Sequence, residues 1–281
     1  MKKERLSIGL DIGGSKILGL LHNQHSGKSY AAKRQPICKE NLSDLLTQIT
    51  EEISRLSKEA DQRQAEIIGV GIGVPGPINN GKIINCANLQ ILKGKKLEQL
   101  LSQSIKIKKI VLDNDLNCFL RAYLKKHPGL NNQSLVVVAL GTGIGGSIAI
   151  NGHNIINSLG ISSELGHIIV DQAGHDLEYY YHKITGHPAG QLFTAAQQGN
   201  KTAQKKISQF AHIFGLVMAN LNTILNPQTI ILTGGVARYH KLYLAEVQQI
   251  IKDYSFTANR PRWRIGHNQQ AGALGASLLI K

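Results

Sequence analysis

The sequence predicts an α/β protein built from two related lobes. Short apolar runs of strand length alternate with longer segments whose apolar residues recur at helical spacing. A strand followed by a glycine-rich turn occurs near residue 8 and again near residue 137, which indicates a repeated unit. The 281 residues provide enough material for two cores of ordinary domain size. We expect an N-terminal lobe over 1–118, completed by the C-terminal helix 270–281, and a larger C-terminal lobe over 119–269.

The first half of the chain is rich in short strands that end at glycine, proline or aspartate. The run from Leu6 to Asp11 is the first strand, and a second apolar run follows it as its hairpin partner. Leucine and isoleucine then recur at helical spacing behind a capping residue, Asn41 or Ser43. The expected elements are strands at 6–11, 17–21, 67–74 and 107–112, and helices at 42–56 and from 115 towards 126.

The second half of the chain restarts this pattern. A fully apolar strand runs into a segment of alternating glycines, and Asn151-Gly152 is a hairpin-turn signal after the next strand. A long amphipathic helix stops at Asn226-Pro227, because proline cannot continue it. The expected elements are strands at 135–140, 147–150 and 229–233, and helices at 207–224 and 271–279.

The chain is strongly basic, with 32 lysine and arginine residues against 18 acidic residues and a net charge of +14. Such a balance fits anionic small molecules, nucleic acid or a membrane surface. The basic residues lack the aromatic pattern, zinc-finger spacing or helix–turn–helix context of nucleic-acid-binding modules. The alternating Arg260, Arg262 and Arg264 are typical of a solvated strand face, so we expect no nucleic-acid partner.

Cysteine usage and hydropathy argue against a disulfide-rich protein and against a membrane-spanning one. Only Cys38, Cys86 and Cys118 occur, without a CxxC pair, which argues against a disulfide framework. No apolar stretch approaches the roughly 18 residues of a transmembrane helix, and the amino terminus leads directly into a strand instead of a signal sequence. These features predict a cytoplasmic protein with no membrane partner.

Three glycine-rich turns each follow a strand, at Gly13-Gly14, at 141–146 and at Gly234-Gly235. Glycine lets the backbone approach a bound anion and direct several N–H groups at it, so these turns predict phosphate binding. The middle turn matches G-x-G-x-x-G, but a strand follows it where a dinucleotide-binding fold requires a helix. The first turn lacks the spacing of a P-loop, so both nucleotide-binding motifs are excluded.

Several carboxylates lie at positions suited to metal binding, catalysis or sugar binding. Asp11, beside the first glycine pair, is suited to hold Mg²⁺ through water. Asp115 follows a strand and Asn114, and it is either a general base or the cap of the next helix. Glu164 and His167 lie three residues apart and are suited to hydrogen-bond a polyol, although a purely structural histidine is the commoner case.

Seven motifs in this order resemble those of one family. They are Asp-Ile-Gly-Gly-Ser-Lys, Gly-Val-Pro-Gly-Pro, Asp-Asn-Asp-Leu-Asn, Gly-Thr-Gly-Ile-Gly-Gly, Glu-Leu-Gly-His, Leu-Thr-Gly-Gly-Val and Ala-Gly-Ala-Leu-Gly-Ala. Together, over about residues 6–279, they closely resemble the ROK family of bacterial sugar kinases and related repressors. The resemblance implies a two-lobed actin/Hsp70/hexokinase-like (ribonuclease H-like) α/β fold with a nucleotide and sugar cleft between the lobes.

The resemblance also implies roles for the motif residues. Asp11 matches the residue near Mg²⁺ and the γ-phosphate, and Asp115 matches the catalytic base. The implied ATP contacts are Asp11, Gly13, Gly14, Ser15, Lys16, Gly141, Thr142, Gly143, Gly145, Gly146, Gly234 and Gly235. The implied sugar contacts are Asn88, Asn114, Asp115, Glu164, His167 and Glu178.

One departure from the family pattern concerns zinc. The family usually follows ExGH with a CxCGxxGCxE module, in which the same histidine also binds zinc. Here a shorter segment without cysteine follows His167, and the pattern resumes at Glu178, which is assigned to the sugar. His175, His182 and His187 lie nearby, but their irregular spacing is typical of surface histidines. We therefore expect no zinc site.

The activity implied by the resemblance is transfer of the γ-phosphoryl group of ATP to a hexose hydroxyl, with Asp115 accepting the hydroxyl proton. Gly-Val-Pro-Gly-Pro-Ile and Asn-Leu…Leu-Lys-Gly look most like the glucokinase branch, so glucose is the expected sugar. N-acetylmannosamine, N-acetylglucosamine and fructose are the alternatives. A homodimer is expected, with apolar surface for it near Leu192 to Leu225.

Two alternatives belong to other functional classes. A sugar-responsive repressor of the family would carry a helix–turn–helix ahead of the first phosphate loop, where only ten residues precede Asp11. A non-catalytic sugar-binding protein would not need Asp11, Asn114-Asp115 and three glycine turns together. The sequence therefore favours the kinase.

Overall fold

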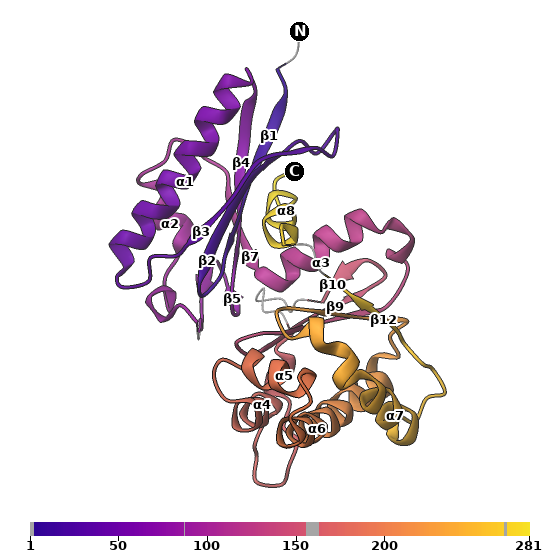
Figure 1. Ribbon diagram of the computed structural model, residues 1–281. Helices are drawn as coiled ribbons and strands as arrows, with labels where there is room; N and C mark the ends of the chain where they lie inside the picture. Colours follow the sequence, from indigo (N-terminus) through magenta and orange to yellow (C-terminus); the bar gives the residue numbers. More distant parts are fainter. Residues whose placement is uncertain (1–2, 87, 156–162, 267–268) are drawn as a thin grey trace. The chain divides into compact units, whose positions relative to one another are not determined.

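The computed structural model describes residues 3–86, 88–155, 163–266 and 269–281. The chain divides into two compact units, and each has its own five-stranded sheet and hydrophobic core (Figure 1). Of the described residues, the first unit comprises 3–128 and 269–281, and the second comprises 129–155 and 163–266. The carboxyl terminus therefore belongs to the first unit.

The first unit is built on a mixed sheet with the strand order β3-β2-β1-β4-β7. The hairpin pairs β1–β2 and β2–β3 are antiparallel, whereas β1, β4 and β7 run parallel to one another. The strands are β1 (Arg5–Ile12), β2 (Lys16–His22), β3 (Ser29–Pro36), β4 (Glu66–Val74), β7 (Ile110–Asn114) and the separate pair β5 (Ile78–Asn79) and β6 (Lys82–Ile83). The helices are α1 (Leu42–Gln62), α2 (Leu97–Ser102), α3 (Asp115–Lys126) and α8 (Ala271–Ser277).

The two faces of the first sheet carry different kinds of residue. Along β4, valine and isoleucine pack into the core with α1, and the alternating glycines at 69, 71 and 73 lie on the opposite face. Figure 1 shows α1 and α8 on opposite sides of this sheet. A Cβ on Gly71 would overlap the carbonyl oxygen of Ala276 in α8. Because only glycine permits this close approach, α8 lies directly on the backbone of the sheet.

The second unit repeats the topology of the first. Its strand order, β10-β9-β8-β11-β12, corresponds strand for strand to that of the first sheet. The pair β8–β9 is antiparallel, and β8–β11 and β11–β12 are parallel. The strands are β8 (Leu135–Leu140), β9 (Ile144–Ile150), β10 (His153–Asn154), β11 (Thr229–Thr233) and β12 (Arg262–Ile265). The helices are α4 (Leu177–Thr185), α5 (Gly190–Gln197), α6 (Lys201–Leu225) and α7 (Leu244–Tyr254). The repeated strand-and-glycine pattern thus corresponds to a repeated sheet.

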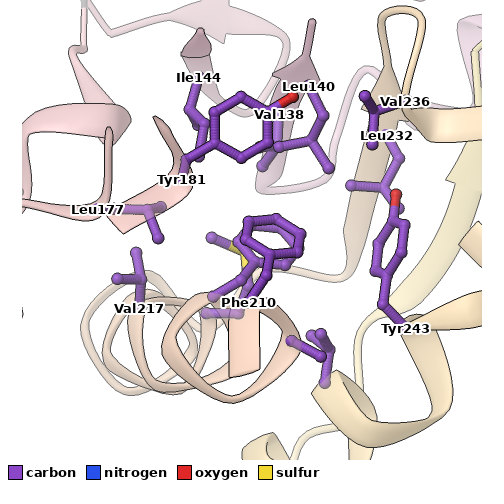
Figure 2. Close-up of a cluster of buried hydrophobic side chains, with 14 of the residues drawn as sticks. Val138, Leu140, Ile144, Leu177, Tyr181, Phe210, Val217, Leu232, Val236 and Tyr243 are labelled. Carbon is purple, nitrogen blue, oxygen red and sulfur yellow. The ribbon is translucent and has the colours of Figure 1, made fainter. Parts of the chain in front are cut away.

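Aromatic rings fill the core of the second unit (Figure 2). The ring of Phe210 in α6 lies 5.4 Å from that of Tyr181 in α4 and 5.9 Å from that of Tyr243. Leu140, at the end of β8, is fully buried in the same cluster. This packing holds α4 beside the end of β8, where one of the glycine-rich turns begins.

The two longest helices begin at asparagine caps. The side chain of Asn41 accepts the N–H of Asp44 at the start of α1, and that of Asn200 accepts the N–H of Ala203 at the start of α6. Asn226, in the left-handed conformation with φ of 45°, ends α6 as the Asn-Pro signal predicts. Across the described ranges, we find no helix with both the length and the apolar character needed to cross a membrane.

Several predicted boundaries are wrong. α1 continues to Gln62, α6 begins at Lys201 and β9 begins at Ile144. β7 covers Ile110–Asn114 and not 107–112, because it pairs with β4 up to the last residue of that strand. The final helix ends at Ser277, two residues before its expected end. The sequence prediction also lacks β3, whose residues are mostly exposed and therefore show no regular apolar alternation.

The glycine contact with α8 makes a prediction about stability. Gly71→Ala should lower the free energy of unfolding by about 1–3 kcal/mol, because the new Cβ forces α8 away from the sheet. The matched control is Gly129→Ala, where the Cβ would enter open space and should change stability by less than about 0.5 kcal/mol. Urea denaturation measures both, and equal midpoints for the two variants would contradict the packing described.

Candidate functional site

Three parallel strands of the first unit end side by side at one edge of the sheet. The register pairs Asp11 of β1 with Gly73 of β4, and Gly73 with Asp113 of β7. Asn114 and Asp115 follow at the junction of β7 and α3. We call the group formed by Asp11, Asn114 and Asp115 the first carboxyl edge. Ligands of open α/β sheets bind outside the carboxyl ends of the strands, so this edge is a candidate site.

Asp11 is half-buried, and its carboxylate packs against Gly272 in α8. Burial raises the pKa of this carboxyl to about 6, and the charge of Arg34 opposes the shift only in part. A buried carboxylate with so little local positive charge gains from a nearby cation. Hard divalent cations prefer oxygen ligands, so this group fits the role expected for it near Mg²⁺.

The first glycine turn joins β1 to β2 beside Asp11. It is closed by a hydrogen bond from the N–H of Gly13 to the carbonyl of Lys16, at 2.9 Å. The side chains of Ser15 and Lys16 are exposed. A Cβ on Gly14 would lie 2.5 Å from the Cβ of Asn88, so the structure brings this turn and the Asn88 segment together. A predicted phosphate contact and a predicted sugar contact are therefore neighbours within the first unit.

Asn114, and not Asp115, caps α3. Its side-chain oxygen accepts the N–H groups of Leu116, at 2.9 Å, and Asn117, at 3.3 Å. Its amide nitrogen donates to the carbonyl of Gly76 at 3.1 Å, which ties the Gly-Val-Pro-Gly-Pro segment to the same point. Asp115 is the first helical residue, and its side chain accepts the N–H of Leu116 at 2.9 Å. The cap hypothesis for Asp115 is therefore wrong.

The second and third glycine turns are neighbours in the second unit. They follow β8 and β11, which are parallel and paired as far as Ala139 and Thr233. Gly234 packs against the carbonyl of Leu140, and the N–H of Val236 donates to that carbonyl at 2.9 Å. Gly234 and Gly235 are exposed, as is Thr142 in the other turn. The structure thus places residues 141–146 beside Gly234-Gly235.

Helix α4 holds the second glycine turn at two points. The Tyr181 hydroxyl donates to the carbonyl of Gly141 at 2.7 Å. The Glu178 carboxylate accepts the N–H of Ile144 at 3.0 Å, and a Cβ on either Gly143 or Gly166 would collide with that carboxylate. Glu178 therefore joins the predicted phosphate loop to the Glu164–His167 segment. The resemblance to the family implies only a sugar contact for Glu178, and no sequence motif points to Tyr181.

The segment that carries Glu164 and His167 packs directly on β9. Leu165 fills the space that a Cβ on Gly146 would occupy, so the 3₁₀ turn η3 (Leu165–His167) is held against the second glycine turn. Burial raises the pKa of the half-buried Glu164 carboxyl. His167 is exposed, and its hydrogen bond to Asp176 raises the pKa of its imidazole. The structure therefore brings Glu164, His167 and Glu178 together.

Comparison with known proteins identifies the family. The family model described as ROK family matches residues 7–176 and 175–281, almost the whole chain. The chain belongs to the ROK family. It is similar to the N-acetyl-D-glucosamine kinase of Haemophilus influenzae (strain 86-028NP), with 25% identity over 97% of this chain and 98% of that protein. It is also similar to the glucokinase of Halalkalibacterium halodurans, with 25% identity over 99% of this chain and 96% of that protein.

Solved structures of the family share the fold. The crystal structure of a ROK family glucokinase from Streptomyces griseus, in complex with glucose and AMPPNP, matches with a TM-score of 0.77 at 21% identity. The match covers 98% of this chain and 99% of that one. It confirms the predicted actin/hexokinase-like α/β fold.

This ROK chain lacks the cysteines of the family's zinc module. Its three cysteines are free thiols, and two of them, Cys86 and Cys118, are buried in the first unit. Among the residues that the structure describes, no three His, Cys, Asp or Glu side chains converge as metal ligands would. His175 and His182 instead bond to carboxylates of their own segment. The expectation of no zinc site stays a prediction.

The buried charge of Asp11 makes a second prediction. Because its native pKa of about 6 lies above the ordinary value of 3.8, the parent protein loses stability as pH rises from about 4 to 6. Asp11→Asn removes this penalty and should raise the free energy of unfolding by about 1–3 kcal/mol above pH 6. Towards pH 4 the gain should largely disappear, because the native carboxyl is then protonated and the unfolded carboxyl is close to its own pKa of 3.8.

The control for Asp11→Asn is the same substitution at the exposed Asp44 in α1, which should show no such gain. Urea denaturation at pH 8 and at pH 4 provides the comparison. An Asp11→Asn protein that is no more stable than the parent at pH 8 would show that the ionised Asp11 carboxylate does not destabilise the native state.

Proposed function

We propose that this ROK protein is an ATP-dependent sugar kinase that transfers the γ-phosphoryl group to a hexose hydroxyl. The observation that carries the proposal is the first carboxyl edge. There a half-buried carboxylate, Asp11, lies near the end of β1, and a second carboxylate, Asp115, is the first residue of the helix after a parallel strand. Phosphoryl transfer needs these two functions, charge neutralisation and activation of the attacking hydroxyl. The kinases among its relatives support the same conclusion.

The glycine turns would bind the phosphates of ATP. The first turn offers the exposed residues Ser15 and Lys16 beside Asp11, and the two turns of the second unit offer the exposed residues Thr142 and Gly234-Gly235. Asp11 would hold Mg²⁺ through water. When bound, the cation supplies neutralisation of phosphate charge.

Asp115 would act as the general base for the attacking sugar hydroxyl. Asn114 supports this role, because its side chain, and not that of Asp115, is the N-cap of α3. As the first residue of the helix, Asp115 is also fixed in position by the β7–α3 junction. A base that is already held in place can accept the proton as the hydroxyl attacks. The activation barrier is then lower, because the side chain does not have to move during the reaction.

Glu164, His167 and Glu178 are the sugar contacts that we propose within the second unit. Asn88 and Asn114 are those that we propose within the first unit. The raised pKa of Glu164 reflects a carboxylate taken partly out of water, where its hydrogen bonds to hydroxyl groups are stronger. Glu178 also bonds to the second glycine turn, so it would contact the sugar and support the phosphate loop together.

Glucose is the substrate we propose, from the motifs Gly-Val-Pro-Gly-Pro-Ile and Asn-Leu…Leu-Lys-Gly. N-acetylglucosamine is the second candidate, because the curated relatives include N-acetyl-D-glucosamine kinases at the same identity as the glucokinase. N-acetylmannosamine and fructose complete the sugars to be compared. We also propose the homodimer and the cytoplasmic location expected from the sequence.

Asp115→Asn tests the proposed base. Stability should change by only a few tenths of a kcal/mol, because Asn114 supplies the cap and an asparagine side chain can still accept the N–H of Leu116. Turnover should fall by roughly 10²–10⁴-fold, because an amide cannot accept a proton at neutral pH. Sugar affinity should fall far less. Steady-state kinetics and sugar titration measure the two effects separately.

Asp44→Asn is the matched control, since Asp44 also lies in the first turn of a helix but far along the chain from the carboxyl edge. It should leave turnover unchanged. A folded Asp115→Asn protein that phosphorylates sugar at a near-normal rate would remove Asp115 from the mechanism and refute the proposed site.

A further inference from the structure

The segment between His167 and α4 forms a small hairpin that is held by its own side chains. The N–H of Val170 donates to the carbonyl of His175 at 2.8 Å, and that of Leu177 donates to the carbonyl of Ile168 at 3.0 Å. We call residues 168–177 the connecting hairpin. It begins directly after His167 and ends in the first residue of α4, so it links the predicted sugar ligand to that helix.

Asp176, near the end of the connecting hairpin, bonds in two directions. One carboxylate oxygen accepts the N–H of Tyr179 at 2.7 Å and caps α4. The other lies 2.8 Å from Nδ1 of His167. A carboxylate only accepts hydrogen bonds, so Nδ1 must carry the hydrogen. Asp176 therefore connects the His167 ring to the start of a helix that is packed into the core.

A second aspartate–histidine pair holds the other end of the connecting hairpin. Asp171 lies 2.8 Å from Nδ1 of His175, and it accepts the Tyr180 hydroxyl at 2.6 Å. The His175 ring stacks on that of Tyr179, with 4.1 Å between their centroids. This pair has the geometry of the first pair, but His175 is not among the predicted sugar ligands. It is therefore a natural control.

We propose that Asp176 is a positioning residue that fixes the ring of His167 through Nδ1 and thereby presents Nε2 to a sugar hydroxyl as a hydrogen-bond acceptor. This inference rests on the proposed function of the site. With the hydrogen on Nδ1, neutral imidazole has its lone pair on Nε2, on the opposite side of the ring. The side chain of His167 is 59% exposed, and its Nδ1 edge faces Asp176.

Asp176→Asn tests the proposal, because asparagine keeps the capping oxygen but faces His167 with an N–H donor. The His167 ring should then lose its preference for hydrogen on Nδ1 and place it on Nε2. Nitrogen-15 NMR of the sugar-free, full-length protein at alkaline pH, where the ring is neutral despite its raised pKa, reports this change of tautomer directly. Affinity for glucose should fall about tenfold, the effect of losing one good hydrogen bond.

Asp171→Asn is the matched control, with the same substitution in the same hairpin. It should leave the His167 tautomer unchanged and alter glucose affinity by less than about twofold. AMPPNP affinity should be unchanged in both variants, which verifies that each is folded. If Asp176→Asn does not fold, Asp176→Ser, which also retains a capping oxygen, takes its place.

Two results would overturn the positioning role. One is an unchanged His167 tautomer in the Asp176 variant, and the other is an equal loss of glucose affinity in both variants. Failure of the proposed function is seen separately, because the parent would then bind neither glucose nor N-acetylglucosamine, whereas the tautomer is measured without any sugar.

Discussion

Direct contact between the C-terminal helix and the first sheet is the constraint on which the candidate site depends. Glycine in β4 lets α8 lie on the strand backbone, and Gly275 in α8 in turn lets the backbone of α3 approach at Cys118. Gly272 brings the start of α8 against the Asp11 carboxylate. One short helix thus packs against β1, β4 and α3, the elements that carry Asp11 and Asp115. Loosening it would affect both carboxylates at once, although neither lies in it.

In the second unit, different contacts hold the candidate site residues in place. There the glycine turn after β8 is held from outside by α4, through Tyr181 and Glu178, and the core around Phe210 keeps that helix in place. The connecting hairpin then ties α4 to His167 through Asp176, and its Asp171 bonds to His175 and to Tyr180 of α4. In the family pattern a zinc module follows this histidine. In this chain hydrogen bonds hold the same stretch, which explains how the segment can be ordered without the cysteines.

Local patterns in the sequence predict much of the fold but little of the support around the site. Strands such as β8 and the turn at Asn151-Gly152 were predictable because apolar runs and turn residues act over a few positions. The bounds of β7 were not, because pairing with β4 decides where it ends. The motif residues identified the candidate site, and the structure assigns the helix cap to Asn114. Contacts such as Glu178 with Ile144 join residues far apart in sequence, and only the tertiary fold reveals them.

The most direct test of the proposed kinase is a coupled ADP-release assay on the full-length protein with ATP and Mg²⁺. The sugars to be compared are glucose, N-acetylglucosamine, N-acetylmannosamine and fructose. We predict that at least one of them, glucose first, raises ADP release well above the sugar-free rate and yields one sugar phosphate for each ADP. A folded protein that releases ADP at the same rate with and without every sugar of the panel would contradict it.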